Sequence, residues 1–308
     1  MTLPSALSLI DAGDLRVAYL DAGDPLGEPV VLLHGFPYDI GSYREVVPLL
    51  SEAGYRVIVP YLRGHGPTRF LRADTPRSGQ QAALGADLLA LLDALELEQP
   101  VLAGYDWGGR AACVVAALWP ERVAALVSVN GYLIQDIAAA GTPIEPSLEA
   151  GFWYFWYFST ARGRAGLERN RRGIAEVIWR RNSPEGSVSK AELDAAAVAF
   201  ENPDYVDVVI HSYRHRSGLA AGDPRYDEWE ERLAALPPIT VPTITLDGDA
   251  DGNFPATDGS HQSHLFTGIR EHRRIPHAGH DLPHDAPHAF AEAIRDAAEP
   301  PSDGAGTP

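Results

Sequence analysis

The stretch at 104–109, Gly-Tyr-Asp-Trp-Gly-Gly, combines a carboxylate with small residues on both sides. A short apolar run precedes it and a helical pattern follows, so we expect Asp106 at a tight strand-to-helix turn that tolerates only small neighbours. The helix would supply backbone N–H groups and a partial positive charge beside the carboxylate. Such a carboxylate can attack an electrophilic carbon directly. The alternative is a glycine-rich turn in which Asp106 only caps the helix.

Two later segments carry an acid and a base in the chain order that a nucleophile–acid–base triad can have. The loop at 247–251, Asp-Gly-Asp-Ala-Asp, follows an apolar run. Asp249 and Asp251 are both candidates for the acid. His280, in Gly-His-Asp, is the candidate base, since a histidine can accept and return a proton near neutral pH.

A further turn could stabilise negative charge near Asp106. The residues at 34–37, His-Gly-Phe-Pro, follow the apolar run at 30–33. We expect the backbone N–H groups of Phe36 and Trp107 to form an oxyanion hole there.

The segments that must position these groups alternate between two patterns. The residues at 80–97 have the apolar spacing of an amphipathic helix. Short apolar runs predict buried strands, and we place them at 30–33, 55–59, 101–103, 125–129 and 240–246. Because strands alternate with helices, the sequence predicts a mostly parallel sheet in an α/β fold.

The pattern changes after residue 131. The segment 132–234 contains seven consecutive aromatic residues at 152–158 and no clear strand, which predicts an inserted helical cap. The core domain is then formed by 1–131 and 235–298. The remaining residues, 299–308, are rich in proline, glycine and acid, and we expect a disordered tail.

These motifs together resemble α/β-hydrolase-fold enzymes with an aspartate nucleophile, the group that contains epoxide hydrolases and haloalkane dehalogenases. The resemblance covers nearly the whole chain. It implies the α/β-hydrolase fold, a mostly parallel sheet flanked by helices with an inserted cap, in which Asp106 is the nucleophile and His280 the base. It also implies that Asp251 is the acid, because Gly248 to Asp251 match the pattern Gly-x-x-Asp of the group. Asp249 remains the competing candidate.

The predicted cap resembles that of epoxide hydrolases most closely. Those enzymes hold the epoxide oxygen with two cap tyrosines. One lies in a Tyr-Arg pair, which Tyr213 matches, and the other in an aromatic motif, which Tyr154 matches with Tyr157 as the alternative. The resemblance implies that an epoxide is opened to a vicinal diol through an ester on Asp106, which water activated by His280 then hydrolyses.

The aromatic residues also indicate the substrate. We expect a small molecule, a bulky apolar or aromatic epoxide, in a pocket lined by five aromatic residues: Phe36, Trp107, Trp153, Trp156 and Tyr157. No cofactor is implied.

Two other functions remain open. A haloalkane dehalogenase with the same triad would bind the halide through the indole N–H of Trp107 and a second donor, for which Trp153, Trp156 or Trp179 could serve. Alternatively, the fold could serve only to bind a ligand or partner, because fold alone does not determine function.

Composition excludes several classes of protein. The 308 residues have a formal net charge of -17, which would repel nucleic acid and anionic membranes. No apolar stretch is long enough for a membrane span and no signal peptide is evident, so we expect a cytoplasmic protein. The acidic residues at 247–258 match the spacing of a calcium loop, but an apolar strand precedes them instead of a helix. We therefore expect no metal site.

Overall fold

The computed structural model describes residues 7–299, and a nine-stranded sheet lies at its centre. The strand order is β1-β2-β4-β3-β6-β7-β8-β9, with β5 paired to β2. The strands are β1 (Ser8–Ala12), β2 (Leu15–Gly23), β3 (Pro29–Leu33), β4 (Arg56–Pro60), β5 (Arg69–Phe70), β6 (Val101–Gly104), β7 (Ala125–Val129), β8 (Thr243–Gly248) and β9 (Arg270–Ile275). From β4 to β9 every neighbouring pair is parallel, whereas β2 pairs antiparallel with β1, β4 and β5. The prediction of a mostly parallel sheet is confirmed.

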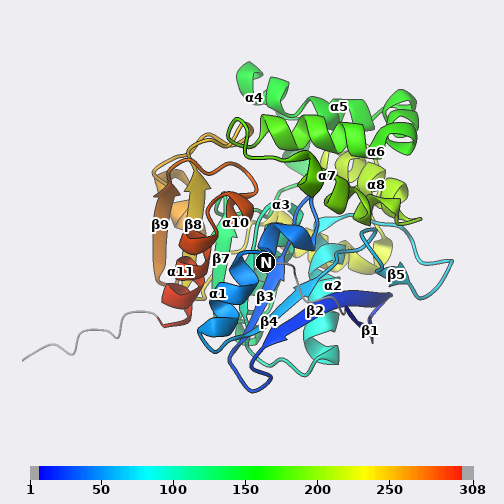
Figure 1. Cartoon of the computed structure of the whole chain (residues 1–308). Helices are drawn as coiled ribbons and strands as arrows, with labels where there is room; N and C mark the ends of the chain where they lie inside the picture. Colours follow the sequence, from blue (N-terminus) through cyan, green and yellow to red (C-terminus); the bar gives the residue numbers. More distant parts are fainter. Residues whose placement is uncertain (1–6, 300–308) are drawn as a thin grey trace, which may run out of the picture.

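Helices cover both faces of the sheet (Figure 1). On one face α1 (Val46–Glu52) packs against α11 (Pro287–Ala298), and on the other α2 (Gln81–Ala94) packs against α3 (Asp106–Leu118). The strands between these layers are buried on both faces, which is why β6 and β7 consist almost entirely of apolar and small residues.

Two strand predictions need correction. The strand expected at 240–246 begins at Thr243, because the preceding Pro242 has no backbone N–H to donate within a central strand. The antiparallel strands β1 and β2, which precede the first predicted strand, were not expected.

The chain between β7 and β8 forms helices and no strand, as the aromatic and arginine-rich sequence indicated. Figure 1 shows α4 to α8 above the edge of the sheet where the parallel strands end. The helices are α4 (Pro146–Gly151), α5 (Trp153–Phe158), α6 (Ala161–Arg181), α7 (Lys190–Ala197), α8 (Tyr205–Arg216) and α9 (Asp227–Ala234). The predicted division into core and cap stays a prediction, and the predicted tail at 299–308 lies, except for Glu299, outside the described residues.

This arrangement brings several loops to one place. Parallel strands have their carboxyl ends at the same edge of a sheet, so the loops that follow β3, β6, β8 and β9 lie together beneath α5 and α8. A short helix, α10 (Leu282–Asp285), follows the loop after β9.

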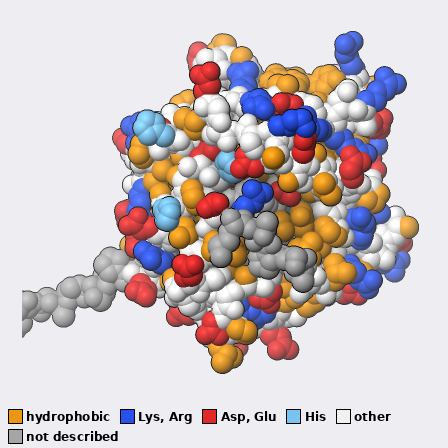
Figure 2. All heavy atoms as spheres, in the orientation of Figure 1, with side chains coloured by type: hydrophobic (Ala, Val, Ile, Leu, Met, Phe, Trp, Pro, Cys, Tyr) orange, Lys and Arg blue, Asp and Glu red, His pale blue; other side chains and the backbone are white. Residues whose placement is uncertain are grey.

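The surface carries charges of both signs. Figure 2 shows Lys and Arg side chains over the upper part of one face, with Asp and Glu side chains interspersed among them and below. No helix within residues 7–299 has the length and apolar character needed to cross a membrane.

Candidate active site

Asp106 stands at the junction of β6 and α3 in a strained backbone conformation. Its φ is 50°, in the left-handed region that residues other than glycine rarely adopt. The turn is close-packed against β3, since a Cβ on Gly108 would lie 2.1 Å from the carbonyl oxygen of Leu33. The small residues around Asp106 therefore allow a turn that holds its carboxylate above the sheet edge.

One carboxylate oxygen of Asp106 is held by the turn after β3. The backbone N–H of Phe36 donates to Oδ1 of Asp106 at 2.8 Å. Gly35 is in close contact with the same side chain, because a Cβ there would lie 2.6 Å from Cβ of Asp106. The ring of Trp107 stacks on Phe36 with centroids 5.7 Å apart. The Phe36 N–H thus contacts the Asp106 carboxylate, and the role of the Phe36 and Trp107 N–H groups as an oxyanion hole stays a prediction.

His280 lies between two carboxylates. Its Nδ1 is 2.8 Å from Oδ2 of Asp251, and its Nε2 is 3.5 Å from Oδ2 of Asp106. Burial lowers the pKa of this imidazole, but the charges and hydrogen bonds of Asp251 and Asp106 outweigh burial and raise the pKa to about 10. Conversely, burial raises the pKa of Asp106, but His280 and the Phe36 N–H outweigh it and the net shift is downward. The resting site therefore holds an imidazolium between two carboxylates.

The structure brings Asp251, and not Asp249, to His280. Oδ1 of Asp251 accepts hydrogen bonds from the backbone N–H groups of Asn253 at 2.8 Å and Phe254 at 3.0 Å, which orient Oδ2 toward the imidazole. Asp249 is exposed and accepts a hydrogen bond from the backbone N–H of His277 at 2.6 Å.

The other carboxylates of this loop do not converge on a common centre. Oδ2 of Asp247 accepts from the backbone N–H and the hydroxyl of Thr257, at 2.9 and 3.0 Å. Throughout residues 7–299, no three His, Cys, Asp or Glu side chains are grouped so that they could hold a metal ion.

Tyr154 on α5 and Tyr213 on α8 pack against the ring of Phe36, with centroids 6.4 and 5.3 Å from it. Both are buried, and their rings meet edge to face with centroids 5.3 Å apart. The hydroxyl of Tyr154 accepts a hydrogen bond from Nδ2 of Asn253 at 3.2 Å, and that of Tyr213 has no partner among the described residues. Burial, and then the negative charge of Asp106 and nearby groups, raise the pKa of each phenol. Both hydroxyls therefore remain protonated donors at neutral pH.

The other predicted aromatic residues lie farther from this centre. The hydroxyl of Tyr157 lies against α6, where a Cβ on Gly166 would be 1.9 Å from it, so Tyr154 and not Tyr157 faces the site. Trp153 is partly buried beside Tyr154, with ring centroids 5.9 Å apart. Trp156 is 52% exposed and its indole N–H donates to Glu149 at 3.2 Å, so the structure does not bring it to the other site residues.

The open space next to Asp106 is small. A cavity of about 20 Å³ is bounded by Asp106, His280, Tyr154 and two arginines, Arg110 and Arg216. This is room for roughly one water molecule.

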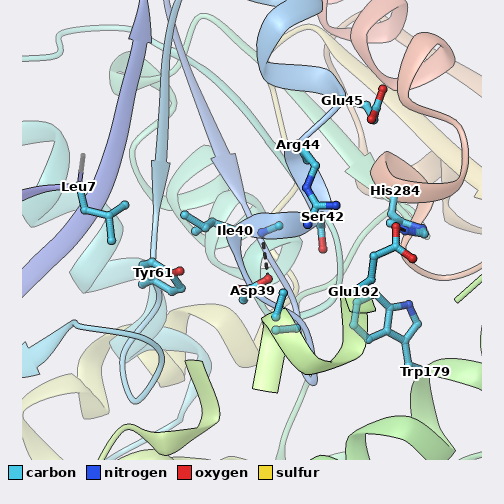
Figure 3. Close-up of a pocket in the computed structure, with 13 residues that line it drawn as sticks. Leu7, Asp39, Ile40, Ser42, Arg44, Glu45, Tyr61, Trp179, Glu192 and His284 are labelled. Carbon is cyan, nitrogen blue, oxygen red and sulfur yellow. Dashed lines mark hydrogen bonds and ion pairs between the residues drawn. The ribbon is translucent and has the colours of Figure 1, made fainter. Parts of the chain in front are cut away.

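A larger cavity of about 520 Å³ lies apart from these residues (Figure 3). Asp39, Glu192 and His284 line it, and none of the predicted catalytic residues does. Trp179, which borders it, packs edge to face on Tyr38 at 5.0 Å, and the Tyr38 ring lies 6.4 Å from His280. These two aromatic rings thus separate the larger cavity from the imidazole.

Three polar residues at the site were not assigned a role from the sequence. Asn130, which follows β7, donates from its side-chain amide to Oδ2 of Asp251 at 3.3 Å. Arg110 follows Asp106 by four residues and Arg216 follows Tyr213 by three. Those spacings place the two residues of each pair on one face of their helix. This periodicity is the feature of the sequence from which both arginines could have been predicted.

Known proteins resemble this chain in sequence and in fold. The model of a family described as alpha/beta hydrolase fold matches residues 28–287. The chain is also similar to a Klebsiella pneumoniae protein that has been provisionally assigned as an epoxide hydrolase. Their structures superpose with a TM-score of 0.93 and 50% sequence identity, over 95% of this chain and 97% of that one.

Two proteins with named activities are similar over most of their length. Epoxide hydrolase A of Mycobacterium tuberculosis is 27% identical over 312 residues, which cover 93% of this chain and 95% of that protein. A haloalkane dehalogenase of Psychrobacter cryohalolentis is 29% identical over 303 residues, which cover 94% of this chain and 90% of that protein.

Proposed function

The chain belongs to the α/β hydrolase family, and we propose that it is an epoxide hydrolase that opens its substrate through a covalent ester on Asp106. Its relatives are named as hydrolases, and the predicted resemblance to the epoxide hydrolase and haloalkane dehalogenase group is confirmed. The finer proposal, epoxide as substrate and Asp106 as nucleophile, draws its support from the geometry of the site.

In the first half of the proposed reaction, Oδ2 of Asp106 attacks an epoxide carbon. The carbon–oxygen bond of the ring breaks, and its electron pair moves to the epoxide oxygen. Tyr154 or Tyr213 donates a proton to that oxygen and becomes a tyrosinate. Oδ1 meanwhile stays in the hydrogen bond from Phe36, where it becomes the carbonyl oxygen of the ester.

In the second half, the His280 imidazolium first passes its proton through solvent to the tyrosinate. The neutral imidazole then removes a proton from water, and the hydroxide attacks Cγ of Asp106. Negative charge then develops on Oδ1, where the Phe36 N–H is already in place to stabilise it. His280 returns its proton to the departing alcohol oxygen, so the diol leaves. The new carboxyl group gives its proton to His280, which restores the Asp106 carboxylate and the imidazolium. Asp251 orients the imidazole throughout.

The tyrosine pair is the observation that carries the proposal. Two buried phenols that keep their protons meet above a carboxylate nucleophile, and they come from different helices of the inserted segment. An epoxide leaves an oxygen anion that needs O–H donors, which this pair would provide. We accordingly propose that 132–234 acts as a cap that completes the active site.

Dehalogenation is the second candidate, because the indole Nε1 of Trp107 is buried without a hydrogen-bond partner among the described residues. An unpartnered N–H beside the nucleophile could bind a departing halide. A haloalkane dehalogenase is also among the similar proteins.

Replacing the two hydroxyls separates the candidates. We expect Tyr154→Phe and Tyr213→Phe each to slow diol formation about 10² to 10³-fold, the typical cost of losing a donor aimed at developing charge. The double variant should be nearly inactive while its circular dichroism is unchanged. Trp107→Phe should leave diol formation largely intact. A double tyrosine variant that forms diol at the parent rate, or a parent that releases halide and no diol, would refute the epoxide proposal.

A further inference from the structure

Two arginines border the cavity next to Asp106, and neither forms an ion pair among the described residues. Arg110 lies one turn after Asp106 on α3, and Arg216 is the last residue of α8. Each is partly exposed, and each donates one long hydrogen bond of 3.4 Å to a neutral amide oxygen, that of Gln81 or Gln135. A guanidinium has five N–H donors, so most of these donors are free to meet a ligand.

The two glutamines join the arginines into one network. Nε2 of Gln81 donates to the backbone oxygen of Gln135 at 2.8 Å, and Oε1 of Gln81 accepts from the backbone N–H of Gln135 at 3.0 Å. Nε2 of Gln135 in turn donates to the backbone oxygen of Arg216 at 2.8 Å. The amides thus fix the positions of both cationic side chains without neutralising their charge.

Among the described residues, Glu230 contacts this network through Gln81 and forms no ion pair with either arginine. Glu230 accepts hydrogen bonds from the side chain of Gln81 at 3.0 Å and the backbone N–H of Ala82 at 3.1 Å, at the amino end of α2 where negative charge is favoured. Elsewhere the chain pairs a buried arginine directly: Arg63 binds Asp87 through two hydrogen bonds of 2.6 and 2.7 Å.

Placing two positive charges at one cavity is unfavourable. Burial, followed by the charge of Arg216, lowers the pKa of Arg110 to about 9. Asp106 offsets part of this charge in the resting site, but esterification removes the charge of Asp106 while both arginines remain. The contact of the Arg216 guanidinium with the ring of Phe155, 4.5 Å from the centroid, explains the orientation of Arg216 but not why Arg110 lies near it. An anionic group on the substrate would relieve the repulsion.

We propose that Arg110 and Arg216 bind a carboxylate on the substrate, so that the preferred substrates are small epoxides with a carboxylate next to the ring. The inference rests on the proposed epoxide hydrolase function and specifies its substrate class. The planar fork of a guanidinium matches the geometry and the charge of a carboxylate. With a net charge of -17 the protein repels anions at a distance, so recognition requires cations at the site itself.

Binding of an unreactive analogue tests the subsite without catalysis. Cyclopropanecarboxylate has the shape of glycidate with a methylene group in place of the ring oxygen, and cyclopropanecarboxamide is its neutral counterpart. By calorimetry we expect the parent protein to bind the carboxylate at least about 10-fold more tightly, the scale of a hydrogen bond to a charged group. Arg216→Gln and Arg110→Gln should each remove most of this preference, and Arg216→Lys should keep part of it. Arg169→Gln, at an exposed position of α6, is the matched control and should keep all of it.

Equal binding of the two analogues by the parent would overturn the proposal. So would a preference for the carboxylate that neither glutamine variant reduces, with folding checked by circular dichroism.

Kinetics with glycidate and glycidamide then separates this inference from the proposed function. We expect a higher kcat/KM for glycidate, and a ratio between the two substrates that falls about 10-fold or more in Arg216→Gln. If Arg216→Gln only made Asp106 a weaker nucleophile, both substrates would react more slowly by the same factor and the ratio would stay unchanged. If the parent protein opens glycidamide faster than glycidate, the carboxylate subsite is refuted while the epoxide hydrolase function is retained. If no epoxide yields a diol but cyclopropanecarboxylate still binds selectively, the proposed function is refuted and the subsite is supported.

Discussion

Nε2 of His280 lies 3.5 Å from Oδ2 of Asp106, so the proposed base and the proposed nucleophile form an ion pair before the reaction begins. The proposed mechanism needs the imidazole neutral in the second half-reaction, although its pKa is raised to about 10 in the resting site. Formation of the ester removes the charge of Asp106 and with it one of the two carboxylates that stabilise the imidazolium. The first half-reaction thereby prepares the base for the second.

This relationship predicts a lower pKa for His280 when Asp106 is neutral. Asp106→Asn imitates the ester in charge and shape, and we expect the pKa of His280 in this variant to fall clearly below its value of about 10 in the parent. Nuclear magnetic resonance titration of the imidazole measures both values. An unchanged pKa would mean that Asp106 does not control the protonation of the base.

The same shift predicts how stability depends on pH. Because the folded state holds the His280 proton more tightly than the unfolded state, His280 contributes stability that is fully present below pH about 6.5 and is lost as the pH rises through about 10. We expect the Tm of the parent to decline over this interval more than the Tm of His280→Gln. Parallel curves for the two proteins would contradict the raised pKa.

Removing the base should trap the ester. In His280→Gln, Asp106 can still attack the epoxide, but no group activates the water, so the adduct should accumulate. Mass spectrometry should then show the peptide that contains Asp106 heavier by the mass of the substrate. An unmodified peptide, in a folded variant that binds substrate, would argue against a separate second half-reaction.

The two acid candidates can be compared with a matched pair of substitutions. Asp251→Asn removes the charge that orients His280 at 2.8 Å, and we expect diol formation to fall about 10²-fold or more. Asp249→Asn alters an exposed side chain whose backbone contact an amide oxygen can keep, so little should change. A larger loss with Asp249→Asn would reverse the assignment.

The turn that carries Phe36 should tolerate no side chain at Gly35. A methyl group there would lie 2.6 Å from Cβ of Asp106, which must displace either the turn or the nucleophile. We expect Gly35→Ala to lower kcat by about 10² to 10³-fold, as loss of an oxyanion donor does. Gly173→Ala, in open space on α6, is the control and should leave kcat unchanged. Full activity of Gly35→Ala would show that the turn does not position Asp106.

Much of the fold could be predicted because its signals are local. The strands near 101–104 and 125–129 are short runs of buried apolar residues, and the glycines around Asp106 are needed for a turn that can be recognised from neighbouring residues. The meeting of Asp106 with His280 was predicted from the chain order of a nucleophile–acid–base triad and from the resemblance to the aspartate-nucleophile group.

The residues that were missed depend on contacts between distant segments. Arg110 and Arg216 lie on separate helices, and the chain between them must fold over the sheet before both border one cavity. The predicted aromatic pocket stays a prediction, since composition does not show whether rings surround a space or fill it. The space next to Asp106 is about 20 Å³.

The central claim is that Asp106 itself supplies the first oxygen of the diol. In a single turnover with excess enzyme in water labelled with heavy oxygen, we expect the released diol to be unlabelled and the label to appear in the peptide that contains Asp106. Label in the diol of that first turnover, with an unlabelled peptide, would mean that water attacks the epoxide directly and would contradict the covalent mechanism.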